Sequence, residues 1–436
     1  MGLRRRNFFR SAAGAVAGAL GLGWAGRADA QHSHGAAPSK GRMRTTPAGR
    51  AIPVTTLDLP KLPWQMDGGV KVFRLVAEVV RTEFVPGQAF DLWGYNGSCP
   101  GPTIEVTEGD RVRVLFENRL PEPTTVHWHG IELPISMDGV PAISQPLVRP
   151  GERFTYEFTL RQNGTFFYHT HMAMQEMMGA LGFFIIHPRE AYRPVVHRDF
   201  GIVLQEWAVL PGNTVPDTSS LEFNWFTFNG KAGPAVTPML VKLGERVRIR
   251  LINIGMDHHP IHLHGVQFSV TGTESGRIPD ALWYRQNTVL VGVGQARDIE
   301  FDAVYPGDWM LHCHLPHHMM NHLVPTAGPM SHGTHAPGTP LVAPSPHAPH
   351  RGGGVGRTPG LPQDMWMPMD AQVAKPETYG LPAEWSAALG GMATLVRVLP
   401  PERYEEIMQR IKDGGATPRP AAPAPGSPAS GGGHRH

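Results

Sequence analysis

The stretch from Trp309 to His318, Trp-Met-Leu-His-Cys-His-Leu-Pro-His-His, combines residue types that bind metal ions. If this stretch ends a β-strand, His312 and His314 share one face and Cys313 points to the other, because successive side chains alternate. One short unit then serves two sites. His318 can fold back to the thiolate side, and a thiolate with imidazoles is the ligand set of a blue copper centre. Taken alone, the stretch would equally fit a buried free cysteine beside two surface histidines.

Four His-x-His pairs stand at matching places in the two halves of the chain. They are His127/His129 and His169/His171 in the first half, and His262/His264 and His312/His314 in the second. Chance accounts poorly for this arrangement. Eight imidazoles that converge where two domains meet would form a polynuclear metal cluster, and imidazole suits Cu, Zn, Fe and Ni. The adjoining Cys313 and the lack of a carboxylate-rich ligand set favour copper among these metals. Ordinary surface histidines are the alternative, which the matched pairs argue against.

An internal repeat surrounds these pairs and predicts the fold class. Arg111 falls over Arg246, and the same offset carries His127 onto His262. Short runs of alternating polarity are separated by Pro and Gly turns, which is typical of an all-β sandwich or barrel. We therefore predict two homologous β-domains, at 69–188 and 200–400.

The two copies differ at the positions that a blue copper centre needs. In the repeat, Cys313 of the second half aligns with Thr170 of the first, His259 aligns with Thr124, and His318 aligns with Gln175. The first domain therefore keeps the paired histidines and lacks the thiolate site. Only the second domain can hold a blue copper ion.

Composition narrows the class of protein further. The 436 residues are enough for more than one domain, and a formal net charge of +2 gives no strong attraction to nucleic acid or to an anionic membrane. Only 2 Cys stand against 23 His and 19 Met, which excludes a disulfide framework. If Cys313 binds metal, Cys99 has no partner in the chain, and we interpret it as a small, partly buried residue.

The ends of the chain and one insertion fall outside the predicted domains. Residues 1–30 resemble a twin-arginine export signal, because Arg5-Arg6-Asn7-Phe8-Phe9-Arg10 precedes an apolar run, too short to span a membrane, and an Ala-x-Ala cleavage pattern. This predicts a periplasmic or extracellular protein without a membrane span. We also expect a linker at 31–68, a flexible insertion at about 326–388 and a disordered tail at 413–436.

Taken together, four motifs resemble those of the multicopper oxidases, the laccase-like family built of cupredoxin domains, and above all its two-domain bacterial members. In the family's order they are His127-Trp-His-Gly130, His169-Thr-His171, His259-Pro-Ile-His-Leu-His-Gly265 and His312-Cys-His-Leu-Pro-His-His318. The resemblance covers about residues 69–325 and the strand near 393–400. It implies two cupredoxin-like Greek-key β-sandwich domains and four copper ions: one of type 1, one of type 2 and two of type 3.

The resemblance also implies a role for each motif residue. The type 1 copper would be held by His259, Cys313 and His318, and the type 2 copper by His127 and His262. One type 3 copper would be held by His129, His169 and His314, and the other by His171, His264 and His312. Cys313 would pass electrons to the cluster through its neighbours in the chain.

Two further positions follow from the resemblance. Asp138 stands where the family has an acidic residue beside the trinuclear cluster, so it would help deliver protons to bound oxygen; the alternative is a turn residue before Gly139. Relatives often have an axial methionine ten residues after the cysteine, and here that position is Leu323. Leucine cannot coordinate, which would raise the reduction potential. The repeat leaves Met392 as an alternative axial ligand, and we favour Leu323.

The activity implied by the resemblance is that of an oxidase. It would couple four one-electron oxidations of a small reducing substrate, by default a phenol or an aromatic amine, to the reduction of O2 to water. Two-domain relatives form homotrimers in which each cluster lies between the first domain of one chain and the second domain of its neighbour. The resemblance implies the same assembly here.

Three alternatives differ from this reading. Six methionines follow the second and fourth motifs, and thioethers would suit a cuprous or other metal-ion oxidase of copper resistance unless they fill the core: Met172, Met174, Met177, Met178, Met319 and Met320. A copper nitrite reductase would need its blue site in the first domain, where this chain has Thr124 and Thr170. A non-catalytic copper-binding protein would not explain Cys313 between two cluster ligands.

Overall fold

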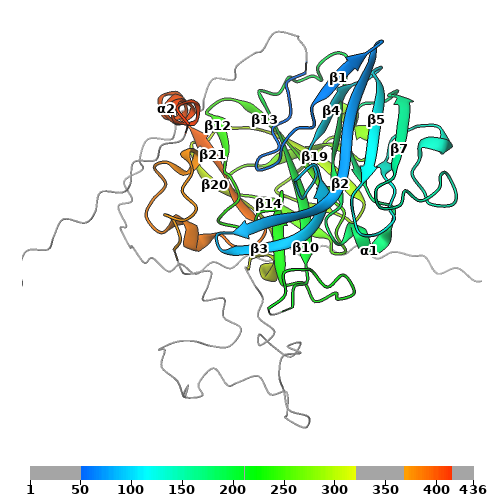
Figure 1. The fold of residues 1–436 in the computed structure, drawn as a ribbon. Coiled ribbons are helices and arrows are strands. Elements are labelled where there is room, and N and C mark those ends of the chain that lie inside the picture. The colour runs from blue at the N-terminus through cyan, green and yellow to red at the C-terminus, as the bar shows by residue number, and fades with distance from the viewer. Residues whose placement is uncertain (1–50, 211, 321–367, 415–436) are drawn as a thin grey trace, which may run out of the picture. The chain divides into compact units, whose positions relative to one another are not determined.

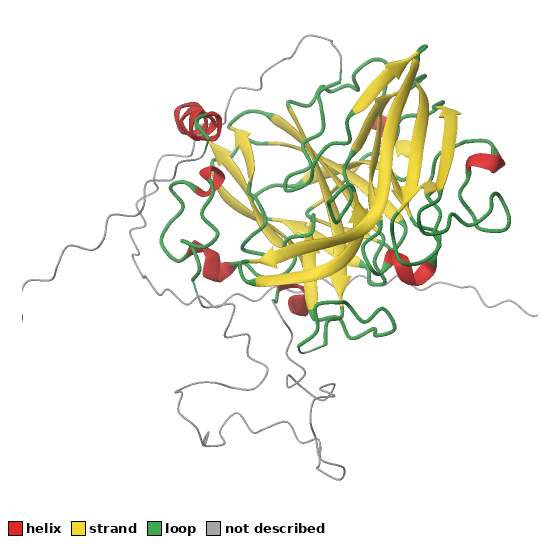
Figure 2. Ribbon diagram, viewed as in Figure 1, coloured by secondary structure: helices red, strands yellow, loops and turns green. Residues whose placement is uncertain are grey.

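The structure, a computed structural model, describes residues 51–210, 212–320 and 368–414, and these are mostly β-strands (Figure 1, Figure 2). The predicted export signal, most of the predicted insertion and nearly all of the tail lie outside the described residues. The described residues all belong to one compact unit. Among them, no helix is both long enough and apolar enough to cross a membrane.

Two sheets form the first sandwich. One has the strand order β1-β2-β5-β7, with β3 paired to β2: β1 (Trp64–Asp67), β2 (Val70–Val85), β3 (Gln88–Tyr95), β5 (Arg111–Asn118) and β7 (Arg153–Thr159). The other has the order β4-β9-β8-β6: β4 (Ile104–Thr107), β9 (Leu181–His187), β8 (Gly164–His169) and β6 (His127–His129). Side chains from both sheets, such as Val114 and Trp128, meet in one buried apolar cluster, which holds the sheets face to face.

Two further sheets form the second sandwich. One has the order β11-β10-β13-β19-β15-β16, with β17 paired to β15: β11 (Trp225–Phe228), β10 (Arg198–Trp207), β13 (Arg246–Asn253), β19 (Gln295–Asp302), β15 (Phe268–Thr273), β16 (Gly276–Arg277) and β17 (Tyr284–Gln286). The other has the order β12-β21-β20-β14-β18: β12 (Met239–Lys242), β21 (Ala393–Leu399), β20 (Gly307–Cys313), β14 (His259–Leu263) and β18 (Thr288–Val291).

Corresponding strands of the two sandwiches pair in the same way. The parallel pair β2/β5 corresponds to β10/β13, the parallel pair β4/β9 to β12/β21, and the antiparallel pair β6/β8 to β14/β20. His127 lies opposite His169 in the first sandwich, as His262 lies opposite His312 in the second. The all-β prediction is confirmed, and the repeat read from the sequence has a counterpart in strand register.

The two sandwiches share a buried interface. Its apolar part joins Phe167 and Phe183 of the first sandwich to Val203 and Ile252 of the second. Its polar part centres on Arg250, whose side chain is 1% exposed and which forms a two-pronged ion pair with Asp199. Arg250 also donates to Thr165 of β8, 2.7 Å away, so one guanidinium ties the first sandwich to the second.

Part of the predicted linker is a packed strap. Thr55 donates its backbone N–H to Asp199 and accepts one from Gly201, which continues the edge of β10. Asp58 accepts hydrogen bonds from the backbone and hydroxyl groups of Thr237. Within the predicted linker, residues 51–63 contact both sandwiches and β1 pairs with β2.

The last part of the predicted flexible insertion is also packed. Residues 368–388 contain two 3-10 turns, η5 (Pro376–Thr378) and η6 (Trp385–Ala388). Buried Arg397 of β21 donates to the carbonyls of Glu377 and Tyr379, so this segment returns along the second sandwich. Of the helices, α1 (Ala173–Glu176) is a single turn, whereas α2 (Pro401–Lys412) packs Tyr404 and Ile407 against Leu240 of β12 and Leu399 of β21. Figure 1 shows α2 beside these two strands.

We expect Asp199→Asn to lower the free energy of unfolding by about 3–5 kcal/mol, because it removes the carboxylate that two buried guanidinium groups share. Arg248 then keeps only Glu300 as an ion-pair partner, and Arg250 keeps only Asp298, at 3.6 Å. Urea unfolding of the metal-free protein measures this loss. The matched control is Asp302→Asn, whose carboxylate is 33% exposed and pairs with Arg246, and which should cost at most about 1 kcal/mol. Equal losses in the two variants would contradict a special role for Asp199.

Candidate metal centres

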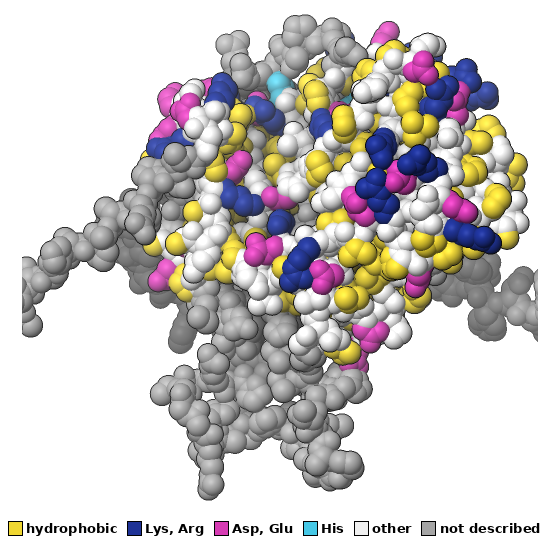
Figure 3. Space-filling model, in the orientation of Figure 1, with side chains coloured by type: hydrophobic (Ala, Val, Ile, Leu, Met, Phe, Trp, Pro, Cys, Tyr) yellow, Lys and Arg dark blue, Asp and Glu magenta, His cyan; other side chains and the backbone are white. Residues whose placement is uncertain are grey.

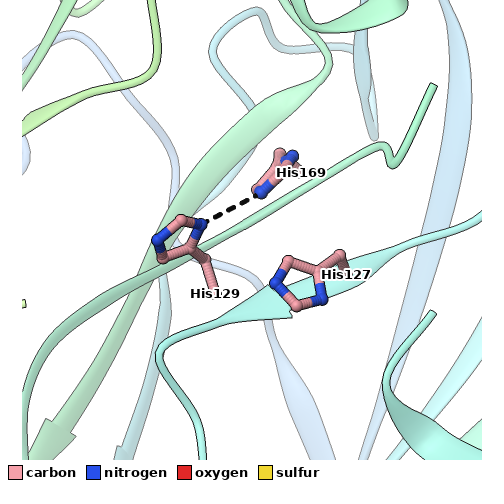
Figure 4. Close-up of side chains that lie close together, drawn as sticks. All are labelled: His127, His129 and His169. Carbon is pink, nitrogen blue, oxygen red and sulfur yellow. Dashed lines mark hydrogen bonds between the residues drawn. The ribbon is translucent and has the colours of Figure 1, made fainter. Parts of the chain in front are cut away.

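The first sandwich gathers four histidines at one end of its smaller sheet. His127 and His129 come from β6 and His169 ends β8, and the three can offer ligand atoms within 4.8 Å of one another. His129 Nδ1 faces His169 Nε2 at 3.3 Å, as Figure 4 shows. His171 completes the set, because its ring centroid lies 5.3 Å from that of His127.

The second sandwich gathers the equivalent four histidines. His262 and His264 come from β14 and His312 from β20, again with ligand atoms within 4.8 Å. His264 Nε2 faces His312 Nε2 at 3.1 Å. The His314 ring lies 5.5 Å from that of His262. The eight predicted cluster ligands therefore form two sets of four, one on each sandwich.

Backbone carbonyls orient equivalent histidines in the same way. His127 Nδ1 lies 2.7 Å from the carbonyl oxygen of Asp138, and His262 Nδ1 lies 2.7 Å from that of Asn287. His169 and His312 each direct Nδ1 at the carbonyl of the next residue, at 2.7 and 2.8 Å. A carbonyl accepts only, so Nδ1 carries the proton and Nε2 keeps its lone pair for a metal ion.

Each predicted type 3 ligand set draws on both sandwiches. His314 was grouped with His129 and His169, yet its ring contacts lie within the second set, to His262 and His312. Among the described histidines, no ring of one set contacts a ring of the other. A single chain therefore places the two halves of the predicted cluster on separate surfaces.

A cavity of about 900 Å³ opens beside the second set. His262 and His264 line it, together with an ion pair between Arg246 and Asp302 and the ring of Tyr305. His264 is exposed, so this set of imidazoles faces open space.

The third group of ligands contains the cysteine. Cys313 Sγ lies 3.4 Å from His318 Nδ1 and 3.9 Å from His259 Nδ1, and the two nitrogens are 3.1 Å apart. Such spacings fit donors that share one ion at about 2.0–2.3 Å. All three residues are fully buried, and one sulfur with two imidazoles is the donor set of a blue copper site. The residues present therefore fit the ion that the sequence predicted.

Burial keeps several of these groups uncharged in the metal-free protein. It raises the pKa of the Cys313 thiol to about 12 and lowers the pKa of His318 to about 2. Burial, with nearby His169, lowers the pKa of His129 to about 4. Neutral imidazoles are ready to bind a metal ion, whereas Cys313 must release a proton as it binds.

The first sandwich has a hydrogen-bonded cluster where the second has the cysteine site. Thr124 and Thr170 share a hydrogen bond of 2.8 Å, and the Thr170 hydroxyl donates to Gln175 Oε1 at 2.9 Å. All three side chains are buried. These are the residues that the repeat aligned with His259, Cys313 and His318, so uncharged polar groups satisfy one another in place of metal ligands.

Met392, the alternative axial candidate, lies next to Cys313 in the second sandwich. The Cys313 N–H donates to the Met392 carbonyl at 3.0 Å, just as the Thr170 N–H donates to Ala180 in the first sandwich. The Met392 side chain is fully buried in the same apolar cluster as Cys313. Leu323, which we favoured from the sequence, lies outside the described residues.

Asp138 lies beside the first histidine set, as predicted. Its carboxylate Oδ1 is 3.4 Å from His127 Nδ1, and its side chain is one-third exposed, so it connects the histidines with solvent. Sequence reasoning missed a second carboxylate here. Glu176 Oε1 of α1 lies 3.1 Å from His169 Nδ1, and the only signal was its place soon after the second motif.

The neighbours of the cysteine site were not foreseen either. Phe226 of β11 stacks on His318 at 4.1 Å, and Glu206 of β10 lies 3.0 Å from His259 Nε2. Both come from strands far from the motifs in sequence, and no motif or spacing marks them. Asp257 Oδ2 lies 3.6 Å from His318 Nε2, and its position two residues before His259 was the one available signal.

Two of the six methionines near the motifs are buried, and a third is partly buried against an apolar cluster. Met177 and Met178 are buried, and Met319 packs against the cluster of Leu389 and Leu395. Met174 is exposed. These positions fit the core-filling alternative better than a continuous thioether surface.

Comparison with known proteins identifies the family. Two family models described as multicopper oxidase match residues 78–191 and 211–326, together just over half of the chain. The crystal structure of a blue copper oxidase from Nitrosomonas europaea is 31% identical, with a TM-score of 0.53, over 58% of this chain and 81% of that one. The chain belongs to the multicopper oxidase family.

Curated relatives share shorter regions with this chain. Copper resistance protein A of Escherichia coli is 37% identical over 31% of this chain and 22% of its own length. Laccase-15 of Oryza sativa subsp. japonica is 30% identical over 51% of this chain and 40% of its own length. The chain thus spans less than half the length of these relatives.

We expect Cys313 to react slowly with iodoacetamide in the folded, metal-free protein at pH 8. A raised pKa keeps the thiol protonated at this pH, so the thiolate is scarce until the pH approaches 12, and unfolding restores an ordinary pKa of about 8.5. Unfolding in guanidinium should therefore raise the alkylation rate at least about a thousandfold. Mass spectrometry of a Cys99→Ser background measures Cys313 alone. Equal rates in both states would show that the thiol is neither buried nor perturbed.

Proposed function

We propose that this protein is a laccase-like oxidase that takes four single electrons from a small reducing substrate and reduces O2 to water. One observation carries the proposal: β20 places Cys313 in a buried sulfur and imidazole site, while the next residues on either side, His312 and His314, belong to a separate histidine set. A protein that only stores copper needs no covalent connection between two kinds of site.

The proposed ligands are those predicted from the sequence. Type 1 copper would be held by His259, Cys313 and His318. Type 2 and type 3 copper would be held by the eight paired histidines, for a total of four ions. When bound, the copper ions supply one-electron redox steps and the capacity to gather four electrons.

The residues of the chain position these ions and manage protons. Cys313 and its flanking peptide units form the shortest covalent route between the two kinds of site. Backbone carbonyls accept hydrogen bonds from Nδ1 of His127 and of His262, which leaves Nε2 of each ring free to bind a metal ion. The Asp138 carboxylate can hold a proton at Oδ1 beside His127 and exchange it with solvent.

A homotrimer would complete the cluster. Each chain carries two histidine sets that do not contact each other, and neither set alone offers the ligands for three ions. Exposed apolar side chains lie between the two histidine pairs of each set in sequence: Ile135 and Ile143 in the first sandwich, and Leu282 and Leu290 in the second. Head-to-tail contacts that close a ring would join the first sandwich of one chain to the second sandwich of the next.

Small reducing substrates fit the surface better than a polyanion does. Figure 3 shows basic and acidic side chains interspersed on the face in view, and the net charge is only +2. Phenols and aromatic amines are our proposed substrates. Oxidation of cuprous or other metal ions is the second candidate, favoured by the similarity to copper resistance protein A. Residues 1–30 support export by the twin-arginine route to the periplasm or beyond.

Cys313→Ser should abolish oxygen uptake by the copper-loaded protein, because serine offers no thiolate to accept electrons at the buried site. Cys99→Ser, a buried cysteine outside every ligand group, is the matched control and should retain uptake. An oxygen electrode measures both, with a simple phenol and with cuprous ion as reductants. Faster uptake with cuprous ion would support the metal-ion candidate, and no uptake with either would refute the proposed activity.

Mixed trimers test whether neighbouring chains share the cluster. His129→Ala removes one ligand from the histidine set of the first sandwich, and His264→Ala removes one from the set of the second. Each variant alone should therefore be inactive. Co-expression in equal amounts should restore about a quarter of the clusters, where an intact first sandwich meets an intact second one. No recovery, in trimers confirmed by light scattering, would place the whole cluster within one chain.

A further inference from the structure

Glu206 is a buried carboxylate that the proposed activity does not yet use. It lies near the end of β10, in the larger sheet of the second sandwich, and its side chain has no exposed surface. Among the described residues, no lysine or arginine pairs with it. A carboxylate in such a place is costly unless hydrogen bonds satisfy it.

Three N–H groups converge on this carboxylate. His259 Nε2 lies 3.0 Å from Glu206 Oε2, and the backbone N–H groups of Met256 and Asp257 donate to Oε1. Each partner is a donor or can act as one, which matches an ionised acceptor. Gly255 makes room for it, because a Cβ at this position would collide with both carboxylate oxygens.

This hydrogen bond determines which ring nitrogen of His259 is free to bind a metal ion. With its proton on Nε2 and donated to Glu206, the ring keeps its lone pair on Nδ1. Nδ1 is the nitrogen that faces Cys313 and His318. The other imidazole of the site differs: among the described residues, His318 Nε2 has no hydrogen-bond partner, and Asp257 at 3.6 Å is 43% exposed.

We propose that Glu206 is a positioning residue that holds His259 in its ligating tautomer and lowers the reduction potential of the cysteine site. The inference rests on the proposed function, since it concerns the copper site assigned there. A fixed negative charge in a region without water stabilises the more positive, oxidised state of a nearby ion. Hydrogen bonding by a carboxylate also makes the ligating imidazole more basic, with the same effect.

The test is the reduction potential of Glu206→Gln, which keeps the shape of the side chain and removes its charge. We expect the blue absorption to remain and the ratio of cupric to cuprous affinity to fall at least about tenfold, which is a rise of about 59 mV for one electron. Redox titration of the blue band measures the shift. Asp257→Asn, at a half-exposed carboxylate, should shift less because water screens its charge. Glu402→Gln, on the surface of α2, should leave the potential unchanged.

A second readout is free of copper. Nitrogen NMR of the metal-free wild type should show His259 protonated at Nε2, and Glu206→Gln should lose this strong preference. Glu206→Asp keeps the charge and should restore part of the tautomer preference and of the low potential. If Glu206→Gln folds without binding copper, the tautomer decides: an unchanged Nε2–H tautomer overturns the proposal, and its loss supports it.

Different results would refute the type 1 copper assignment and the role of Glu206. A wild-type protein without a blue band would refute the type 1 assignment itself. A blue wild type whose potential Glu206→Gln leaves unchanged would refute the role of Glu206 and leave the oxidase assignment intact.

Discussion

The alternation of side chains along one strand, β20, is the constraint on which the structure depends. Because neighbouring residues point to opposite faces, Cys313 enters the apolar interior of the second sandwich while His312 and His314 face the other way. The antiparallel register of β14 and β20 then places His262 opposite His312, so the pair His262/His264 lies beside the pair His312/His314. A slip of one residue would exchange the two faces and destroy both sites together.

Polar groups buried around the sites are held by the backbone or by one another. Backbone carbonyl oxygens accept hydrogen bonds from Nδ1 of cluster histidines, and backbone N–H groups donate to the carboxylate of Glu206. Where the first sandwich lacks the cysteine site, Thr124 and Thr170 pair with each other instead. The same fold thus supports two kinds of buried site: one whose polar side chains satisfy one another, and one whose side chains can bind a metal ion.

The sequence was most informative where chemistry and strand periodicity coincide. Short runs of alternating polarity between turns predicted the all-β class, and the histidine pairs and Cys313 marked side chains that the structure brings together, because each signal depends on local spacing. Features set by long-range packing were missed: the strap at 51–63 looked like a linker by composition, yet its backbone completes a sheet edge. The fold also brings Met392 beside Cys313, although the insertion separates the two residues in sequence.

Glu206 illustrates the same limit for the site. Nothing in the sequence connects an acid in β10 with a histidine that lies 53 residues later. Only the packing of the two sheets brings their side chains into contact. The apolar residue Phe226, which stacks on His318, was equally invisible for this reason.

Anomalous diffraction at the copper edge, from crystals of the copper-loaded protein, would locate each copper ion relative to the chains. We predict one peak within each chain, between Cys313, His259 and His318. We also predict three peaks where the first histidine set of one chain meets the second set of its neighbour. A three-copper cluster held within one chain would contradict the shared assembly, and the absence of a peak beside Cys313 would contradict the whole account.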